Sequence, residues 1–253
     1  MNFPPNDSAG VAVTEDTLLN GRLRLTQPAK GHRAGTDAVL LAAAAPHTDG
    51  LIIDVGAGVG TVGLMLALRN APARAVLLER DPVYAALARR NAEANDLVSR
   101  VSVAETDVLA ALPRRSAGIR NESADVVVTN PPFYEAGSGR RSRDPLKGAA
   151  HVIEGSLSGW LRACVTLLRP GGSLVLIHRP AALGAILESI GQAAGGVSVR
   201  AVHPKADTNA IRIVVRATKG SHAPLELLPP LVLHDASNAF TREAQALHDG
   251  LTF

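Results

Sequence analysis

One stretch decides the fold of this chain, and it reads Leu51-Ile52-Ile53-Asp54-Val55-Gly56-Ala57-Gly58-Val59-Gly60-Thr61. The apolar run from Leu51 to Val55 has the length of a buried strand. The glycines that follow let the backbone adopt positive φ and approach a ligand with no Cβ in the way. The pattern of Thr61–Arg69 then predicts a helix. Strand, glycine-rich turn and helix together indicate a nucleotide-binding α/β fold, although Gly58-x-Gly60-x-x-Gly63 also matches the dinucleotide fingerprint.

The alternation of strand and helix patterns continues along the chain. Further strands are predicted at Ala75–Glu79, Val101–Glu105, Ala124–Thr129 and Ser173–His178, and further helices at Pro82–Asn95, Ser156–Leu168 and Ala181–Gln192. Strands that are apolar on both faces imply a parallel sheet covered by helices. Two more strands, Val197–His203 and Ala210–Ala217, follow each other across a polar loop and predict an antiparallel pair at the end of the sheet.

The segment before these strands predicts an extension of the same domain. Leu18–Leu25 contains two apolar-rich runs around Asn20-Gly21, a pattern typical of a β-hairpin. Thr36 can cap a helix that runs to Ala45 and stops at Pro46. We therefore expect an N-terminal extension over residues 1–48, made of a hairpin and a helix, and a main domain over residues 49–253.

Composition is that of an ordinary globular protein. The 253 residues are 46% hydrophobic and 19% charged, and no apolar stretch reaches the roughly 18 residues of a membrane span. The polar N-terminus is unlike a secretory signal, and Cys164 in a helical pattern predicts a buried thiol. One cysteine and scattered histidines offer no zinc spacing. These observations favour a cytoplasmic protein without a metal, and they leave the oligomeric state open.

Basic residues are concentrated in two runs, although the net charge is only +3. The first run lies between Gly21 and Thr36, and the second between Gly139 and His151. They contain Arg22, Arg24, Lys30 and Arg33, and Arg140, Arg141, Arg143 and Lys147. Such runs can neutralise phosphates, or they can be solvated surface. Their placement on both sides of a candidate active site favours nucleic acid over protein as substrate.

Carboxylates follow the first three predicted strands of the sheet. Asp54 lies inside the end of the first strand, where it suits the cationic ammonium or sulfonium end of S-adenosylmethionine and would repel a pyrophosphate. Glu79 ends the second strand and suits a ribose diol of either cofactor. Asp107 follows the third strand, where it can accept from an adenine amino group or cap a helix. The carboxyl ends of parallel strands share one edge, so we expect an S-adenosylmethionine site there.

The fourth strand ends in Asn130-Pro131-Pro132-Phe133, a tetrapeptide suited to methylating a planar nitrogen. Such a nitrogen is a poor nucleophile because its lone pair is shared with the ring. Asn130 Oδ1 and the Pro131 carbonyl can accept its N–H bonds and make the lone pair available. Both prolines favour extended backbone and lack N–H donors, and Phe133 offers a face on which a base can stack. The alternative interpretation is a proline-rich turn that closes a buried strand.

On these residues the sequence resembles the bacterial valine-tRNA adenine-N6 methyltransferases. The resemblance covers nearly the whole chain and is carried by Lys30–Leu41, Asp54–Gly60, Thr129–Tyr134, His203–Lys205 and Pro230–His234. It implies a Rossmann-like, seven-stranded methyltransferase sheet, S-adenosylmethionine as methyl donor and an RNA substrate, tRNA near the anticodon. The Gly- and Arg-rich segment from Ala136 to His151 departs from the family pattern, which leaves the choice of RNA open.

The resemblance also implies roles for individual residues. The expected catalytic residues are Asn130, Pro131, Pro132 and Phe133. The expected cofactor-binding residues are Gly35, Thr36, Asp37, Asp54, Gly56, Gly58, Gly60, Glu79, Asp107 and Asn130. The expected RNA-binding residues are Phe133, Tyr134, Arg140, Arg141, Arg143 and Lys147.

Other functions use the same residue types. A glutamine side-chain amide in a protein, or the N2 amine of a guanine in rRNA, is also planar and conjugated, so either is an alternative acceptor. A non-catalytic nucleotide-binding module, or a nicotinamide oxidoreductase with a histidine donor such as His32, His151, His178 or His203, would also account for the glycine-rich turn.

Overall fold

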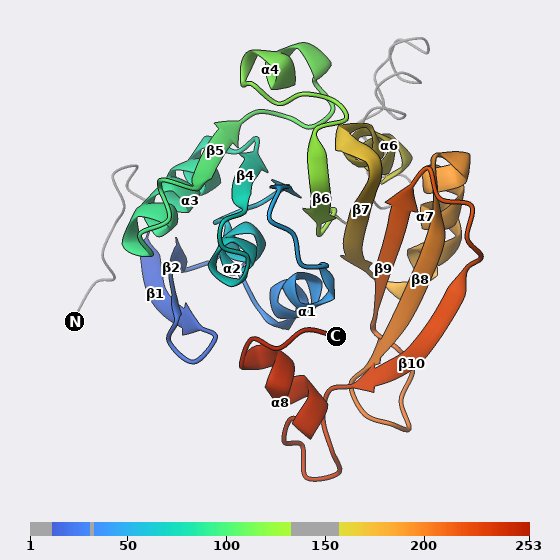
Figure 1. Ribbon diagram of the computed structural model, residues 1–253. Helices are drawn as coiled ribbons and strands as arrows, with labels where there is room; N and C mark the ends of the chain where they lie inside the picture. Colours follow the sequence, from blue (N-terminus) through green and yellow to red (C-terminus); the bar gives the residue numbers. More distant parts are fainter. Residues whose placement is uncertain (1–11, 31–32, 133–156) are drawn as a thin grey trace, which may run out of the picture.

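A single eight-stranded sheet forms the centre of the computed structural model, which describes residues 12–30, 33–132 and 157–253 (Figure 1). The strand order is β10-β8-β9-β7-β6-β3-β4-β5. The bounds are β3 Leu51–Val55, β4 Arg74–Glu79, β5 Val101–Glu105, β6 Ala124–Thr129, β7 Leu168–His178, β8 Ala194–His203, β9 Arg212–Lys219 and β10 Glu226–Val232. The Rossmann-like sheet is confirmed, but the expected seven strands are one too few.

Only β9 runs against the other strands of this sheet. It pairs antiparallel with β7 on one side and with β8 on the other, whereas β3 pairs parallel with β4 and β6. In Figure 1 the arrow of β9 accordingly points away from those of β6 and β10. The antiparallel pair predicted from the sequence is therefore β8 and β9, and β9 is inserted between β7 and β8.

The strand that sequence reasoning missed is β10, which pairs parallel with β8 at the edge of the sheet. Pro229 and Pro230 lie inside it, and the register shifts between Leu228 and Leu231. Proline cannot donate to a strand ladder, so two prolines argue against a central strand. At an edge, within an irregularity of the register, they are tolerated.

Helices cover both faces of the sheet. The elements are α1 Thr36–Ala44, α2 Thr61–Arg69, α3 Pro82–Ala94, α4 Ala111–Ser116, α6 Leu157–Leu167, α7 Leu183–Ile190 and α8 Arg242–His248. Alternate strand residues face opposite sides: Ile52 and Val126 pack with α1 and α2, and Ile53 packs with α6 and α7. Cys164 of α6 is fully buried, as predicted, and burial raises the pKa of its thiol. In the described residues no helix is long and apolar enough to cross a membrane.

The predicted N-terminal hairpin consists of β1 Val13–Leu18 and β2 Leu23–Pro28, with Asn20 and Gly21 at positive φ in its turn. Buried Asn91 of α3 fixes the hairpin to the domain. Its side chain accepts from Thr26 N at 2.7 Å and donates to Thr26 O and to Val59 O. Since Val59 belongs to the glycine-rich turn, Asn91 joins the hairpin to that turn.

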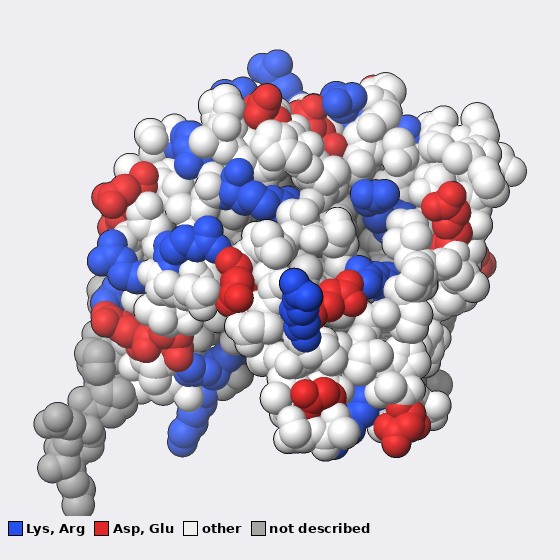
Figure 2. Space-filling model, turned by 60° about the horizontal axis from the view of Figure 1, so that its bottom comes forward, with Lys and Arg blue, Asp and Glu red and all other residues white. Residues whose placement is uncertain are grey.

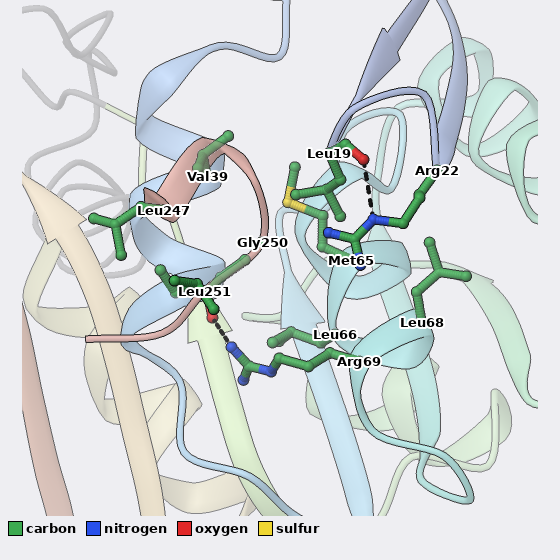
Figure 3. Close-up of a pocket in the computed structure, with 12 residues that line it drawn as sticks. Leu19, Arg22, Val39, Met65, Leu66, Leu68, Arg69, Leu247, Gly250 and Leu251 are labelled. Atoms are coloured by element: carbon green, nitrogen blue, oxygen red, sulfur yellow. Dashed lines mark hydrogen bonds between the residues drawn. The ribbon is translucent and has the colours of Figure 1, made fainter. Parts of the chain in front are cut away.

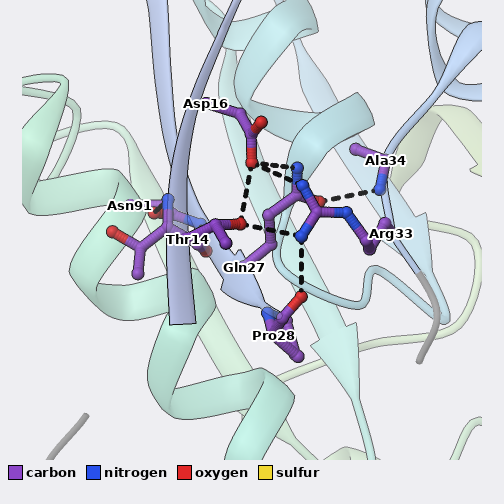
Figure 4. Close-up of polar contacts among 8 residues, drawn as sticks. Thr14, Asp16, Gln27, Pro28, Arg33, Ala34 and Asn91 are labelled. Carbon is purple, nitrogen blue, oxygen red and sulfur yellow. Dashed lines mark hydrogen bonds and ion pairs between the residues drawn. The ribbon is translucent and has the colours of Figure 1, made fainter. Parts of the chain in front are cut away.

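The hairpin also holds the segment that leads into α1 (Figure 4). The Arg33 guanidinium pairs with Asp16 at 2.8 Å and donates to Thr14 Oγ1 at 2.7 Å. Gln27 donates to Asp16 and accepts from Ala34 N at 2.8 Å. Helix α1 begins at Thr36 as expected, but Gly35 is its N-cap and no side chain caps it, so the prediction of Thr36 as the cap is wrong.

The C-terminal segment closes the opposite side of α1. It encloses a cavity of about 170 Å³ between the hairpin turn, α1, α2 and residues 247–251 (Figure 3). Apolar side chains such as Leu66, Leu247 and Leu251 line much of it, and Arg69 at its wall donates to Ala42 O at 2.8 Å. Of the residues predicted for catalysis or cofactor binding, none of those that the structure describes lines this cavity, whereas Arg22 of the first basic run does.

Candidate active site

A second cavity, of about 680 Å³, opens where strands β3, β4, β5 and β6 end. Its lining includes eight of the residues predicted from the sequence, namely Asp37, Gly56, Gly58, Glu79, Asp107, Asn130, Pro131 and Pro132. Among the described residues, Gly35, Thr36, Asp54 and Gly60 are not in its wall. Figure 2 shows the face of the molecule that lies at the bottom of Figure 1, where acidic and basic side chains are interspersed over the surface.

The glycine-rich turn forms one wall of the cavity. Gly56 N and Ala57 N donate to Leu78 O, and Gly58 N donates to Glu79 Oε2 at 2.8 Å. Gly58 has φ +55, and a Cβ there would meet nothing within 4 Å, so it would project into open space. This bare backbone therefore leaves room for a ligand directly beside the Glu79 carboxylate.

Asp54 lies behind this turn and not in the cavity wall. It is 2% exposed, and its Oδ2 accepts from Gly63 N at 2.8 Å at the start of α2. The pKa of Asp54 is raised to about 7, chiefly by burial and also by the nearby charge of Glu79, while the hydrogen bond from Gly63 acts in the opposite direction. Its proposed contact with the cationic end of a cofactor remains a prediction.

Three carboxylates surround the cavity where β4 and β5 end. Glu79 Oε1 accepts from Asp81 N at 2.9 Å, and Asp81 in turn caps α3 through Val83 N. Asp107 accepts from Leu109 N at 2.9 Å and lies 3.5 Å from the exposed Arg80 guanidinium. The alternative interpretation of Asp107 as a helix cap is wrong, because the N-cap of α4 is Ala110; Asp107 closes a local turn and lines the cavity.

Trp160 connects the glycine-rich turn to the start of Asn130-Pro131-Pro132. Its Nε1 donates to Thr129 Oγ1 at 2.9 Å, and Thr129 Oγ1 donates to Val55 O at 2.8 Å. A Cβ on Gly56 would lie 3.0 Å from the Trp160 ring, so glycine is needed for this close approach. Trp160 is 6% exposed and fixes the position of the strand end from which Asn130 projects.

An ion pair between α1 and β9 forms part of the cavity wall. Arg212 Nε of β9 lies 2.8 Å from Asp37 Oδ2 in the first turn of α1, and both residues line the cavity. Sequence reasoning did not find Arg212. It also missed Arg80, Asp81, Tyr84, Thr106 and Trp160 in the lining. Of these, Asp81 had a readable pattern, since an acid before Pro82 is a typical helix start.

Part of the predicted site cannot be placed. Phe133, Tyr134, Arg140, Arg141, Arg143 and Lys147 lie outside the described residues. In the first basic run, Arg22 donates to Asp249 O, Arg24 to Ala94 O and Arg33 to Asp16. Three of its four basic side chains therefore hold the hairpin in place.

The cavity fits S-adenosylmethionine chemically. The cofactor needs an uncluttered backbone for close approach, a carboxylate for the ribose diol and an acceptor for the adenine amine. Gly58, Glu79 and Asp107 supply these three features in one wall. In the described residues, no group of three or more His, Cys, Asp or Glu side chains gathers as a metal site.

Comparisons with known proteins agree with this fit. Residues 33–182 match the family model described as methyltransferase small domain. The chain is 32% identical over 213 residues to a tRNA1(Val) (adenine(37)-N6)-methyltransferase of Aeromonas hydrophila, covering 83% of this chain and 85% of that protein. A relative of the same name from Aeromonas salmonicida is 31% identical, with 85% and 89% of the two chains covered.

Solved structures give the same result for the fold. The crystal structure of a predicted O-methyltransferase from Agrobacterium tumefaciens has a TM-score of 0.72 and 32% identity, and the match covers 86% of this chain and 98% of that one. A Thermus thermophilus 16S rRNA N2 G1207 methyltransferase in complex with AdoMet and guanosine has a TM-score of 0.55 at 20% identity, covering 85% and 52% of the two chains. The chain is an S-adenosylmethionine-dependent methyltransferase that belongs to the methyltransferase small domain family and, within it, to the family of the tRNA1(Val) (adenine(37)-N6)-methyltransferases.

Proposed function

We propose that this enzyme methylates the exocyclic N6 of an adenine in tRNA, close to the anticodon. One observation carries the proposal: Asn130 and Pro131 lie in the same cavity as Gly58 and Glu79, so an acceptor amine and a methyl donor can meet there. The tRNA substrate is taken from the relatives, which are named for adenine(37) of tRNA1(Val).

The proposed chemistry depends on hydrogen-bond acceptors at the end of β6. Asn130 Oδ1 and the Pro131 carbonyl accept the two N–H bonds of the amine, and this localises the lone pair on nitrogen. Pro131 and Pro132 lack N–H groups, so no backbone donor of theirs competes for these acceptors. When bound, S-adenosylmethionine supplies an electrophilic methyl group on sulfonium. Alignment of the nitrogen with that carbon is then the main contribution of the protein.

No strong base is needed in this scheme. Methyl transfer makes the nitrogen acidic, so its proton can leave to solvent afterwards. The target base must first turn out of its stack, which typically costs a few kcal/mol. Phe133 and Tyr134 are proposed to offset part of this free-energy cost by stacking on the base, since a base stacked on an aromatic ring is typically stabilised by about 1–3 kcal/mol.

The proposal is tested by incubating unmodified total tRNA with labelled donor and the purified protein. Digestion and mass spectrometry then identify the methylated nucleoside. N6-methyladenosine is expected, and a variant Asn130→Ala should give none above background. Label in N2-methylguanosine instead would replace the adenine proposal with a guanine one.

The remaining alternative acceptor is a glutamine side-chain amide in a protein. The salt dependence of binding distinguishes this acceptor from RNA, because RNA binding releases counterions and weakens steeply as the salt concentration rises. We expect strongly salt-dependent binding to tRNA. Label found only in protein, with binding insensitive to salt, would support the glutamine acceptor.

A further inference from the structure

Two arginines meet at the end of the ladder between β7 and β9. The last pair in this ladder is His178 with Ile213, and the same register continued by one residue sets Arg179 opposite Arg212. Arg179 has extended backbone angles, φ −69 and ψ 146, so the continuation requires no bend. Arg179 is exposed, and Arg212 lines the large cavity together with Asn130.

The buried residue His178 indicates that the charges of Arg179 and Arg212 act on the same part of the molecule. His178, at the end of β7, is 3% exposed, and its pKa is lowered by burial and then by the charges of Arg179 and Arg212. Like charges opposite each other across strands are destabilising. Arg212 lies in the cavity wall beside its partner Asp37, and the continued register sets Arg179 opposite it, so an anion bound between the two guanidinium groups would be attracted by both.

Asp37 gives one of these arginines a fixed orientation. Arg212 donates through Nε to Asp37 Oδ2 at 2.8 Å and through Nη1 to Ile211 O at 2.9 Å. The planar guanidinium is thus held in the cavity wall, with the side chain 29% exposed. A held, planar cation of this kind is well suited to the oxygen atoms of a phosphate.

The position of the pair suits a nucleotide. In the sheet order, β7 separates β9 from β6, so two strand spacings, about 10 Å, separate the strand of Arg212 from the strand that ends at Asn130. This is comparable to the reach of a purine nucleotide from its exocyclic amine to its own phosphate. A base held at Asn130 would place its phosphate near Arg179 and Arg212.

We propose that Arg179 and Arg212 bind the phosphodiester of the nucleotide whose base is held by Asn130 and Pro131, with Asp37 positioning Arg212. This inference rests on the proposed function, since it requires an RNA substrate at that site. It adds a recognition element that a glutamine acceptor in a protein would not use.

The test compares Arg179→Gln and Arg212→Gln with the control Arg216→Gln. Arg216 is exposed on the same strand, opposite Val175, and its loss removes the same charge away from the cavity. Binding of unmodified tRNA is measured by fluorescence anisotropy over a salt series, methyl transfer by KM and kcat for tRNA, and S-adenosylmethionine affinity by calorimetry.

Arg212→Gln should weaken tRNA binding about tenfold, and Arg179→Gln should weaken it several-fold. Each variant should reduce the slope of log affinity against log salt concentration by about 1. Arg216→Gln should change neither, and donor affinity should stay unchanged in all three.

A second arm excludes a simple folding defect. A short RNA with a neutral methylphosphonate at the target nucleotide is compared with the same RNA carrying the normal phosphate. Wild-type protein should bind the neutral RNA about tenfold more weakly, and Arg212→Gln should show a clearly smaller difference, because only Arg179 still contacts the phosphate in that variant. A destabilised variant would lose affinity for both and keep the difference, which would overturn the proposal.

Other outcomes separate the two proposals. If wild-type protein methylates tRNA but both variants behave like Arg216→Gln, the phosphate site is wrong and the proposed function stands. If wild-type protein binds RNA through these arginines but transfers no methyl group to it, the proposed function fails and the phosphate site stands. Weaker binding of S-adenosylmethionine to Arg212→Gln, with tRNA binding unchanged, would assign the pair to the cofactor instead.

Discussion

The edge of the sheet at which the parallel strands end differs in charge between its two sides, which we call the acidic end and the basic end. Where β4 and β5 end, the cavity wall carries the carboxylates of Glu79, Asp81 and Asp107, with the guanidinium of Arg80 beside Asp107. Where β7 ends and β9 begins, it carries Arg212 paired with Asp37, and the continued register of the β7–β9 ladder would set Arg179 opposite Arg212. Asn130 directly follows β6, which lies between the two ends in the sheet order. This difference suggests a division of roles. The acidic end suits S-adenosylmethionine, which is cationic and carries a ribose diol, and the basic end suits a phosphate of the RNA. The methyl group of the donor and the amine of the target base would then meet at Asn130, between the two ends.

The largest effect is expected where the two ends meet. Asn130→Ala removes the acceptor that localises the lone pair of the amine, and kcat should fall by roughly 100-fold or more, as for loss of a preorganised polar group in other active sites. The affinity for S-adenosylmethionine should stay within about twofold, because the donor is held by the other end. Steady-state kinetics and calorimetry measure the two quantities.

The matched control for this change is Asn121→Ala, which removes an exposed amide before the other end of β6. It should leave both kcat and donor affinity unchanged. Normal turnover of Asn130→Ala would remove Asn130 from the mechanism.

A smaller effect is expected at the acidic end. Glu79→Gln should weaken S-adenosylmethionine binding about tenfold, since hydrogen bonds to a charged group are typically stronger than neutral ones by about 1 kcal/mol or more. Glu105→Gln is the control, because Glu105 pairs in register with Glu79 on β5 and contacts Arg89 at the surface. Equal donor affinities of the two variants would show that the acidic end does not select the cofactor.

The effect farthest from the reacting groups concerns Asp54, the acid that lies behind the cavity wall. Its pKa in the folded protein, about 7, exceeds its ordinary value of 3.8, so the folded state binds more protons between these values. Stability without cofactor should therefore fall as pH rises from about 4 to 7, by on the order of 1 kcal/mol per pH unit, and then level off in this contribution.

Urea unfolding of wild-type protein and Asp54→Asn between pH 5 and 8 measures this contribution. The difference between the two free energies of unfolding should change with pH up to about 7 and become constant above it. Parallel profiles across the whole range would contradict the raised pKa.

Much of the site could be predicted because its residues follow strand ends in sequence. Gly56 and Gly58 after β3, Glu79 at the end of β4 and Asn130 after β6 are each adjacent to an apolar run, and parallel strands bring such positions to one edge. Arg212 lies within the predicted strand Ala210–Ala217, but its partner Asp37 lies 175 residues away, and no local pattern encodes that pair.

Other features depend on packing between distant elements. Trp160 reaches the cavity only because α6 packs on one face of the sheet and Thr129 accepts its Nε1. The first basic run looked like an RNA surface, yet Arg33 forms its ion pair with Asp16 inside the hairpin network. Strand β10 contains two prolines, and proline is typical of positions outside a strand, so the local sequence does not predict a strand there.

The most direct test of the two-ended account is a crystal structure with S-adenosylhomocysteine, the demethylated product of the donor. The account predicts that its ribose contacts Glu79, its adenine lies beside Asp107, and its sulfur faces Asn130. Product bound with its adenosine against Arg212, or in the cavity beneath α1 and α2, would contradict the assignment of the acidic end to the donor.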